Sequence, residues 1–129
     1  MKSREKMKEQ LLYFKGQGLR AFISTESPDL HSESYGLISD GTNIIIINFG
    51  TFTSGFYPSF EYKPSREYGS GYVPESFDHM LGQPVLTMDD LRECIASGRG
   101  YAVSHKIPLY NGLEDYFKDK WNKENYTEL

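Results

Sequence analysis

Apolar residues near the start of the chain recur at the spacing of a helix face. Met7, Leu11 and Phe14 stand at positions i, i+4 and i+7, and Ser3 is the expected N-cap. Residues 19–25 are then rich in residues that favour strands and end in a loop signature. The pattern predicts an N-terminal helix followed by a strand.

Two apolar runs in the next part of the chain are separated by Asp40-Gly41, which predicts a tight β-hairpin. The second run contains the isoleucines Ile44 to Ile47 without an intervening polar residue, so we expect an interior strand covered on both faces. Residues 56–63 predict a returning antiparallel strand, in which Pro58 indicates an edge position or a bulge.

The second half of the chain carries helix signals. Thr87 precedes acidic residues and is the expected N-cap of a helix, with Leu91 and Ile95 on one face and Gly98 as its stop. Residues 101–103 are compatible with a short additional strand.

Asn111 is the expected N-cap of a last helix. The apolar face of this helix would consist of Leu113, Tyr116, Phe117 and Trp121. The whole chain, 1–129, then predicts a single α+β domain: an N-terminal helix, a three- to five-stranded antiparallel sheet, and two C-terminal helices packed on one face. The opposite face would be half exposed and available for a partner or for a homodimer.

Composition narrows the class of protein. The 129 residues carry a formal net charge of −4, which argues against broad nucleic-acid binding and against a basic membrane-surface module. The single cysteine, Cys94, excludes an internal disulfide framework and suits a reducing compartment. The longest apolar run is far too short for a membrane span and the charged start lacks a secretory signal, so we expect a cytoplasmic protein without a membrane partner.

Residues of the usual catalytic types are scattered. His31, His79 and His105 lie in separate segments without a second ligand at helical spacing, so no metal site is expected. Cys94 falls in the middle of a predicted helix, where a packed structural thiol is expected. The chain has no nucleophile elbow, phosphate-binding loop or dinucleotide fingerprint, so we expect a non-catalytic protein without a cofactor.

One segment gathers binding chemistry. Eight aromatic residues lie between Phe49 and Tyr72, where they are interleaved with cations and glycines. Two cations and two phenols beside exposed backbone N–H groups could hold a phosphate and stack a base. The candidate binding residues are Lys63, Arg66, Tyr68, Gly69, Gly71 and Tyr72. The same glycines would serve equally well in a simple turn, and the strand aromatics in the core.

The Asp40-Gly41 hairpin, the Lys63-Pro64 loop and the stretch Gly69-Ser70-Gly71-Tyr72 resemble small uncharacterised accessory proteins of phages and prophages. A helix of the Leu113 to Tyr116 kind near the end extends the resemblance. It implies a mobile-element origin. Small acidic phage proteins often bind and block a host factor, including CRISPR and other defence systems. If this protein is phage-encoded, the resemblance implies that it acts in the cytosol of the host cell.

Three functions follow as hypotheses. The first is a non-catalytic phage-type inhibitor that binds a host protein, and an exposed aromatic and acidic patch would favour it. The second is a protein that binds or sequesters a nucleotide-like ligand at Lys63 to Tyr72, and a concave pocket there would favour it. The third is an enzyme whose site the sequence conceals, and titratable groups converging in a cleft would favour it.

Overall fold

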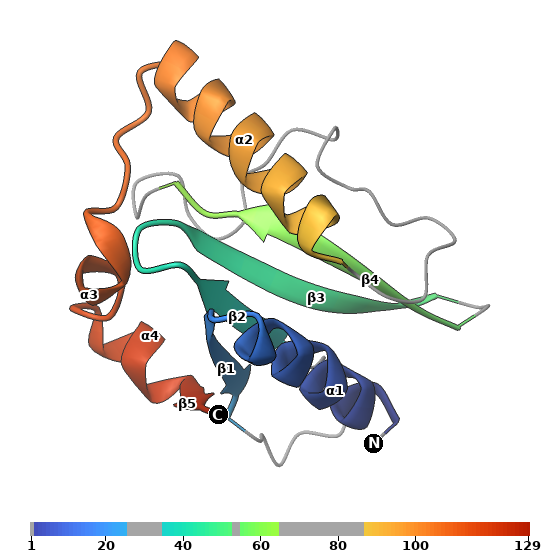
Figure 1. Ribbon diagram of the computed structural model, residues 1–129. Coiled ribbons are helices and arrows are strands. Elements are labelled where there is room, and N and C mark those ends of the chain that lie inside the picture. Colours follow the sequence, from blue (N-terminus) through green and yellow to red (C-terminus); the bar gives the residue numbers. More distant parts are fainter. Residues whose placement is uncertain (1, 26–34, 53–54, 65–86) are drawn as a thin grey trace.

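The computed structural model describes residues 2–25, 35–52, 55–64 and 87–129 (Figure 1). The strands are β1 (Arg20–Ser24), β2 (Tyr35–Ser39), β3 (Ile44–Phe52), β4 (Gly55–Tyr62) and β5 (Tyr126–Glu128). They form an antiparallel sheet in the order β4-β3-β2-β1-β5, so β1 to β4 form a meander and the last strand returns to pair with the first. The helices are α1 (Lys2–Gly16), α2 (Met88–Ser104), α3 (Gly112–Tyr116) and α4 (Lys120–Glu124). The α+β class is therefore confirmed.

The isoleucine run of β3 lies in the sheet interior, between β2 and β4, as predicted. Ile45 and Ile47 point into one apolar cluster, and Ile44 and Ile46 into another on the opposite face. None of the four is more than 8% exposed. Burying such a side chain stabilises a fold by about 1.5–3 kcal/mol, so this strand anchors both faces of the sheet.

The predicted hairpin joins β2 to β3. The Asp40 carboxylate accepts hydrogen bonds from the backbone N–H groups of Thr42 and Asn43, at 2.9 and 2.8 Å. Gly41 has a φ of 100°, in the left-handed region that glycine tolerates best. The aspartate therefore shapes the turn and the glycine permits it.

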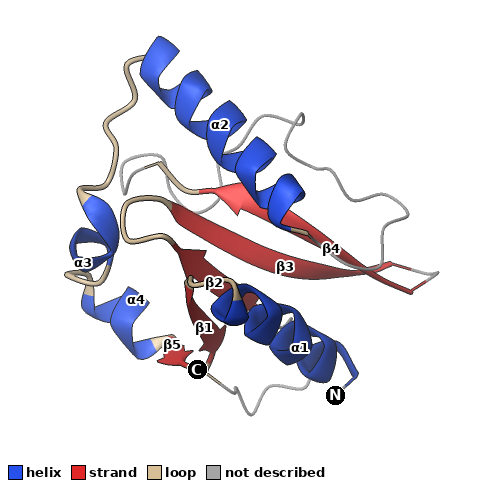
Figure 2. Cartoon of the chain, viewed as in Figure 1, coloured by secondary structure: helices blue, strands red, loops and turns tan. Residues whose placement is uncertain are grey.

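The helices divide between the two faces of the sheet (Figure 2). On the face we call the helix face, α1 packs through Met7, Leu11 and Phe14 together with α2, which contributes Leu91 and Cys94. On the face we call the groove face, the apolar cover comes from the C-terminal segment that contains Tyr110, Leu113 and Tyr116. The expected packing of both C-terminal helices on one face is therefore corrected, because a strand that is apolar on both sides needs cover on both.

Helix α2 begins as predicted and ends later than predicted. Thr87 and Asp90 form a reciprocal capping box at its start. The helix continues through Gly98 to Ser104, so residues 101–103 are helical rather than a strand. A Cβ at Gly98 would lie 2.5 Å from the Tyr62 Cβ, which means that this glycine marks a close approach of helix to sheet instead of a stop.

Four further details of the helices differ from the sequence expectation. Helix α1 begins at Lys2, so Ser3 lies inside it. The single last helix is two short helices, and the Asn111 side chain does not cap the first of them. Asp119 caps the second by accepting from the Trp121 N–H at 2.9 Å. Trp121 is 66% exposed and not part of an apolar face, because the break turns α4 relative to α3.

Candidate functional site

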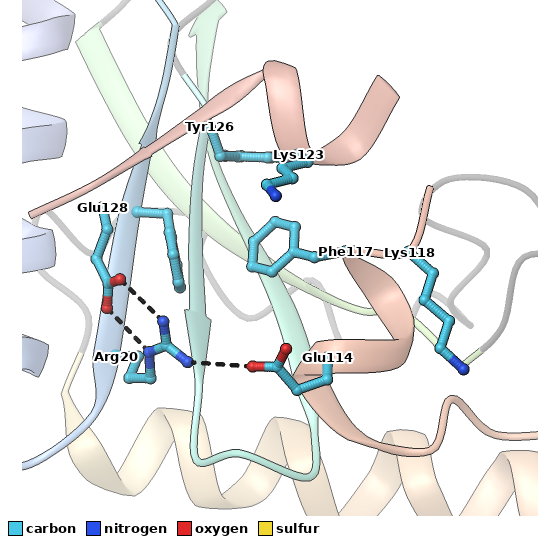
Figure 3. Close-up of a pocket in the computed structure, with 8 residues that line it drawn as sticks. Arg20, Glu114, Phe117, Lys118, Lys123, Tyr126 and Glu128 are labelled. Carbon is cyan, nitrogen blue, oxygen red and sulfur yellow. Dashed lines mark hydrogen bonds and ion pairs between the residues drawn. The ribbon is translucent and has the colours of Figure 1, made fainter. Parts of the chain in front are cut away.

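A surface groove of about 470 Å³ lies on the groove face, where β1 and β5 meet the segment of α3 and α4 (Figure 3). Its walls combine aromatic rings with charges of both signs. The lining residues are Arg20, Phe22, Glu114, Phe117, Lys118, Lys123, Tyr126 and Glu128.

Arg20 is held between two carboxylates (Figure 3). Its Nε and Nη2 donate to the two carboxylate oxygens of Glu128, each at 2.9 Å, and its Nη1 lies 3.8 Å from Glu114 Oε1. The bidentate hydrogen bond to Arg20 lowers the pKa of Glu128, and the same bond raises the pKa of Arg20. This arrangement fixes the guanidinium, whose side chain is nevertheless 48% exposed.

Aromatic rings pack against the Arg20 guanidinium and against one another. The Arg20 Cζ lies 5.3 Å from the centroid of the Phe22 ring, within the range of a cation–π contact. Phe22 meets Phe117 edge-on, with centroids 5.1 Å apart, and Phe117 meets Tyr116 in the same way at 5.3 Å. Burial, together with Tyr126, raises the pKa of Tyr116 far above its ordinary value. The rings of Phe22 and Phe117 that line the groove thus pack in a cluster with a neutral Tyr116.

Two lysines complete the wall of the groove. The Lys123 side chain points toward the Phe117 ring, and that of Lys118 points away from the other groups (Figure 3). Within the described part of the chain, neither ammonium group takes part in an ion pair. Since Arg20 is already paired, an anion that entered beside Phe117 would meet Lys123 as its cation.

The structure describes one residue of the predicted ligand site, Lys63. Its backbone N–H donates to Ile44 O at 2.9 Å, and its ammonium group lies 5.5 Å from the centroid of the Tyr116 ring. Only 8% of the residue is exposed, so its stem packs beside the aromatic cluster of the groove face. Arg66, Tyr68, Gly69, Gly71 and Tyr72 lie outside the described residues, and their role in binding stays a prediction.

Two further candidates for chemistry, Cys94 and His105, lie in the described part of the chain and occupy structural positions. Cys94 is fully buried in α2, which confirms the expected packed thiol. His105 stacks on Tyr101 with ring centroids 3.9 Å apart, at the end of the same helix. His31 and His79 lie outside the described residues. Among the residues that are described, no group of three His, Cys, Asp or Glu side chains could hold a metal ion.

The groove was not anticipated from the sequence. Arg20 and Glu128 are 108 positions apart, and only the pairing of β5 with β1 brings them together. The register places Phe22 opposite Glu128, so the neighbouring Arg20 reaches this carboxylate diagonally on the same face. The sequence Tyr126-Thr127-Glu128 was the available signal for a strand at this place, since Tyr and Thr favour strands.

Comparison with known proteins gave no match: no family model, no curated protein and no solved structure is similar to this chain. Across residues 2–25, 35–52, 55–64 and 87–129, none of the helices is long and apolar enough to cross a membrane.

Proposed function

We propose that this protein acts without catalysis, by binding another protein at the groove beside β1 and β5. The observation that carries the proposal is the combination of a fixed, half-exposed Arg20 with the rings of Phe22, Phe117 and Tyr126. Arginine and aromatic residues dominate the energetics of protein–protein interfaces. Because the two carboxylates already hold the guanidinium in place, a partner would lose little conformational entropy in ordering it.

The charges favour a protein over a simple anion as the occupant. The Glu114 and Glu128 side chains are 90% and 45% exposed, so the groove presents negative as well as positive groups to its occupant. A small anion would be repelled by these carboxylates at the Arg20 end. A protein surface can match both signs at once, with an acid near Lys123 and donors near Glu114.

The resemblance to phage accessory proteins supports a host factor as the target, including CRISPR and other defence systems. Inhibition would follow from occupying a surface that the host factor needs. The nucleotide-like ligand is less favoured, because Lys63, the described member of that site, is packed beside Tyr116.

The test first captures host proteins and then compares how tightly they bind the wild type and two matched variants. The full chain would be immobilised, exposed to bacterial lysate, and its captured proteins identified by mass spectrometry and purified. Lys123→Glu reverses a charge in the groove, and Lys8→Glu makes the same change at an exposed position of α1. We expect one host protein to bind the wild type and Lys8→Glu equally, to bind Lys123→Glu at least about tenfold more weakly, and to lose activity when bound.

Two results would contradict the proposal. One is that every captured protein binds Lys123→Glu as tightly as it binds Lys8→Glu. The other is heat of binding with a nucleotide in a calorimetric panel, unchanged by Lys123→Glu, which would favour the ligand site at Lys63 to Tyr72.

A further inference from the structure

We infer that the partner contributes an extended segment that adds to the sheet as a sixth strand along the outer edge of β5, with an acidic side chain beside Lys123. This inference rests on the proposed function and specifies how the partner is recognised. Three observations carry it: the direction of the backbone groups on β5, the side of the sheet on which the groove lies, and the positive charge of Lys123, which forms no ion pair with the residues that the structure describes.

The backbone of β5 presents an edge. β5 is the outermost strand of the sheet that the structure describes, and it pairs with β1 on one side. Leu129 N–H donates to Ala21 O at 2.9 Å, and Thr25 N–H donates to Asn125 O at 2.8 Å. Antiparallel pairing alternates, so in β5 the odd-numbered residues bond to β1 while the N–H and C=O of Glu128 point outward. An added strand would find a donor and an acceptor there.

The side chains of an added strand would reach the groove. Phe22 pairs with Glu128 and Ser24 with Tyr126, so Tyr126 and Glu128 share the groove face with Phe22. Adjacent strands lie about 4.8 Å apart, and their directly opposed side chains point to the same face. Alternate side chains of a strand beside β5 would therefore lie on the groove face, next to Tyr126 and Glu128 at the rim of the groove.

Charge selects an acidic residue at one of these positions. Opposite Glu128 a second carboxylate would be repelled. Tyr126 lies at the other end of the groove together with Lys123, whose ammonium group points inward (Figure 3). An Asp or Glu placed opposite Tyr126 would reach Lys123 and gain a charge-assisted hydrogen bond.

A second copy of the chain suits this edge less well. Two β5 strands related by a twofold axis at Thr127 would place Tyr126 opposite the partner's Glu128. That carboxylate already accepts two hydrogen bonds from Arg20 of its own chain, so Lys123 would gain less from it than from an Asp or Glu without such a partner. Each copy also carries a net charge of −4, which opposes association.

The test uses a random octapeptide library displayed on phage and panned on the full-length protein. Enriched peptides would be synthesised, and their affinities measured by fluorescence anisotropy for Glu128→Pro, Glu128→Ala and Lys123→Glu. Glu128→Pro and Glu128→Ala both lose the carboxylate, and only the proline also removes the outward N–H. The two variants are therefore matched for the Arg20 ion pair and differ at the proposed edge.

We expect the enriched peptides to alternate Asp or Glu with β-branched or aromatic residues. They should bind Glu128→Pro about tenfold more weakly than Glu128→Ala, because the proline variant lacks one backbone hydrogen bond to the peptide. Their affinity for Lys123→Glu should be lower than their affinity for Glu128→Pro. In the wild-type complex, hydrogen exchange of the Glu128 amide should slow on binding, a readout that holds even if the proline variant does not fold.

The inference would be overturned by enriched peptides without acidic residues, by equal affinity for Glu128→Pro and Glu128→Ala with an unprotected Glu128 amide, or by no enrichment over an unrelated protein. Concentration-dependent dimerisation abolished by Glu128→Pro would assign the edge to a second copy instead. If a captured host protein depends on Lys123 and is indifferent to Glu128→Pro, the proposed function stands and the added strand does not.

Discussion

The two faces of the sheet solve the same burial problem in different ways. On the helix face, α1 and α2 lay long apolar surfaces over β1 to β4, and the packed side chains there include Phe14 and Cys94, both fully buried. On the groove face, the cover is the short α3 and the chain around it. Short helices cover less surface, so the β1–β5 end is left with a groove. The helix face holds the fold together, and the groove face leaves room for binding.

Polar groups follow the same division. At the end of the helix face, Asn43 Oδ1 accepts from the Tyr62 hydroxyl at 2.9 Å and from Arg99 Nη1 at 3.2 Å. The Asn43 amide donates in turn to Asp40 at 3.0 Å, so the hairpin, β4 and α2 are joined by one hydrogen-bond network. This network is centred on the buried Tyr62–Asn43 hydrogen bond and is only partly buried at Asp40 and Arg99. The ion pair of Arg20 with Glu128 also contains an arginine and a carboxylate, but it lies at the surface. A network with a buried centre locks elements together, whereas a surface pair contributes little to stability and stays accessible.

The difference in packing between the helix face and the groove face is tested most sharply with two neighbouring isoleucines that point to opposite faces. Ile47→Ala on the helix face should lower the free energy of unfolding by about 2–5 kcal/mol, because it removes a fully buried side chain and leaves a cavity. Ile46→Ala on the groove face should fall at the lower end of that range, since Ile46 is 8% exposed. Urea unfolding of both variants measures the difference. Equal losses would mean that the two faces are packed equally well.

The polar network should show the next largest effect. Asn43→Ala leaves the buried Tyr62 hydroxyl without the acceptor that it has in the native protein, and should cost about 1–3 kcal/mol. Tyr62→Phe is the matched variant: in its background, Asn43→Ala should cost less, because no hydroxyl is stranded. A double-mutant cycle with no coupling would show that the network does not act as a unit.

A smaller effect is expected where α2 approaches the sheet. Gly98→Ala would drive a methyl group into the Tyr62 side chain, and we expect a net cost of about 1–2 kcal/mol after the gain in helix propensity. Gly100, two residues along the same helix, has open space for a Cβ. Gly100→Ala should therefore stabilise the protein by about 0.5–1 kcal/mol. If both variants gain stability in thermal unfolding, the close packing of α2 on β4 is wrong.

Features set by local interactions were predictable from the sequence. The hairpin at Asp40 depends on a carboxylate that bonds to the next backbone N–H groups, and the start of α2 on the exchange between Thr87 and Asp90. The interior position of Ile44 to Ile47 follows from their apolar character alone. In the hairpin and in the helix cap, the decisive partners lie within a few residues of one another.

Features set by distant contacts were not predictable. Gly98 looks like a helix stop, and only the position of Tyr62 on β4 shows why a glycine is needed inside the helix. The apolar spacing from Leu113 to Trp121 fits one helix, yet the chain is recapped at Asp119 and Trp121 turns outward. A single sequence carries no record of such tertiary neighbours.

The candidate site shows the same limit. The sequence pointed to Lys63 and the aromatic segment after it, because cations and rings are close together there in the chain. The groove instead joins Arg20 to Glu114 and Glu128 from the other end of the chain. A three-residue strand such as β5 has too weak a pattern to reveal this pairing in advance.

The smallest expected effect on stability concerns the Arg20–Glu128 pair. Glu128→Ala should cost about 0.2–1 kcal/mol near neutral pH, because both side chains are half exposed and the pair is screened by water and salt. Since the hydrogen bond from Arg20 lowers the pKa of Glu128 below its ordinary value of 4.5, folding favours the charged carboxylate. The contribution is therefore present above pH 4.5 and is lost as the pH falls through the lowered pKa of the folded state.

The difference in unfolding free energy between wild type and Glu128→Ala should thus be constant from neutral pH down to about pH 5, and should vanish in more acidic solution. Raising the salt concentration at neutral pH should shrink it as well, because the pair is at the surface. Chemical unfolding across a pH series measures both trends. A cost well above 1 kcal/mol that persists in acid and in salt would mean that Glu128 contributes through packing. The groove face would then resemble the helix face in how it stabilises the fold.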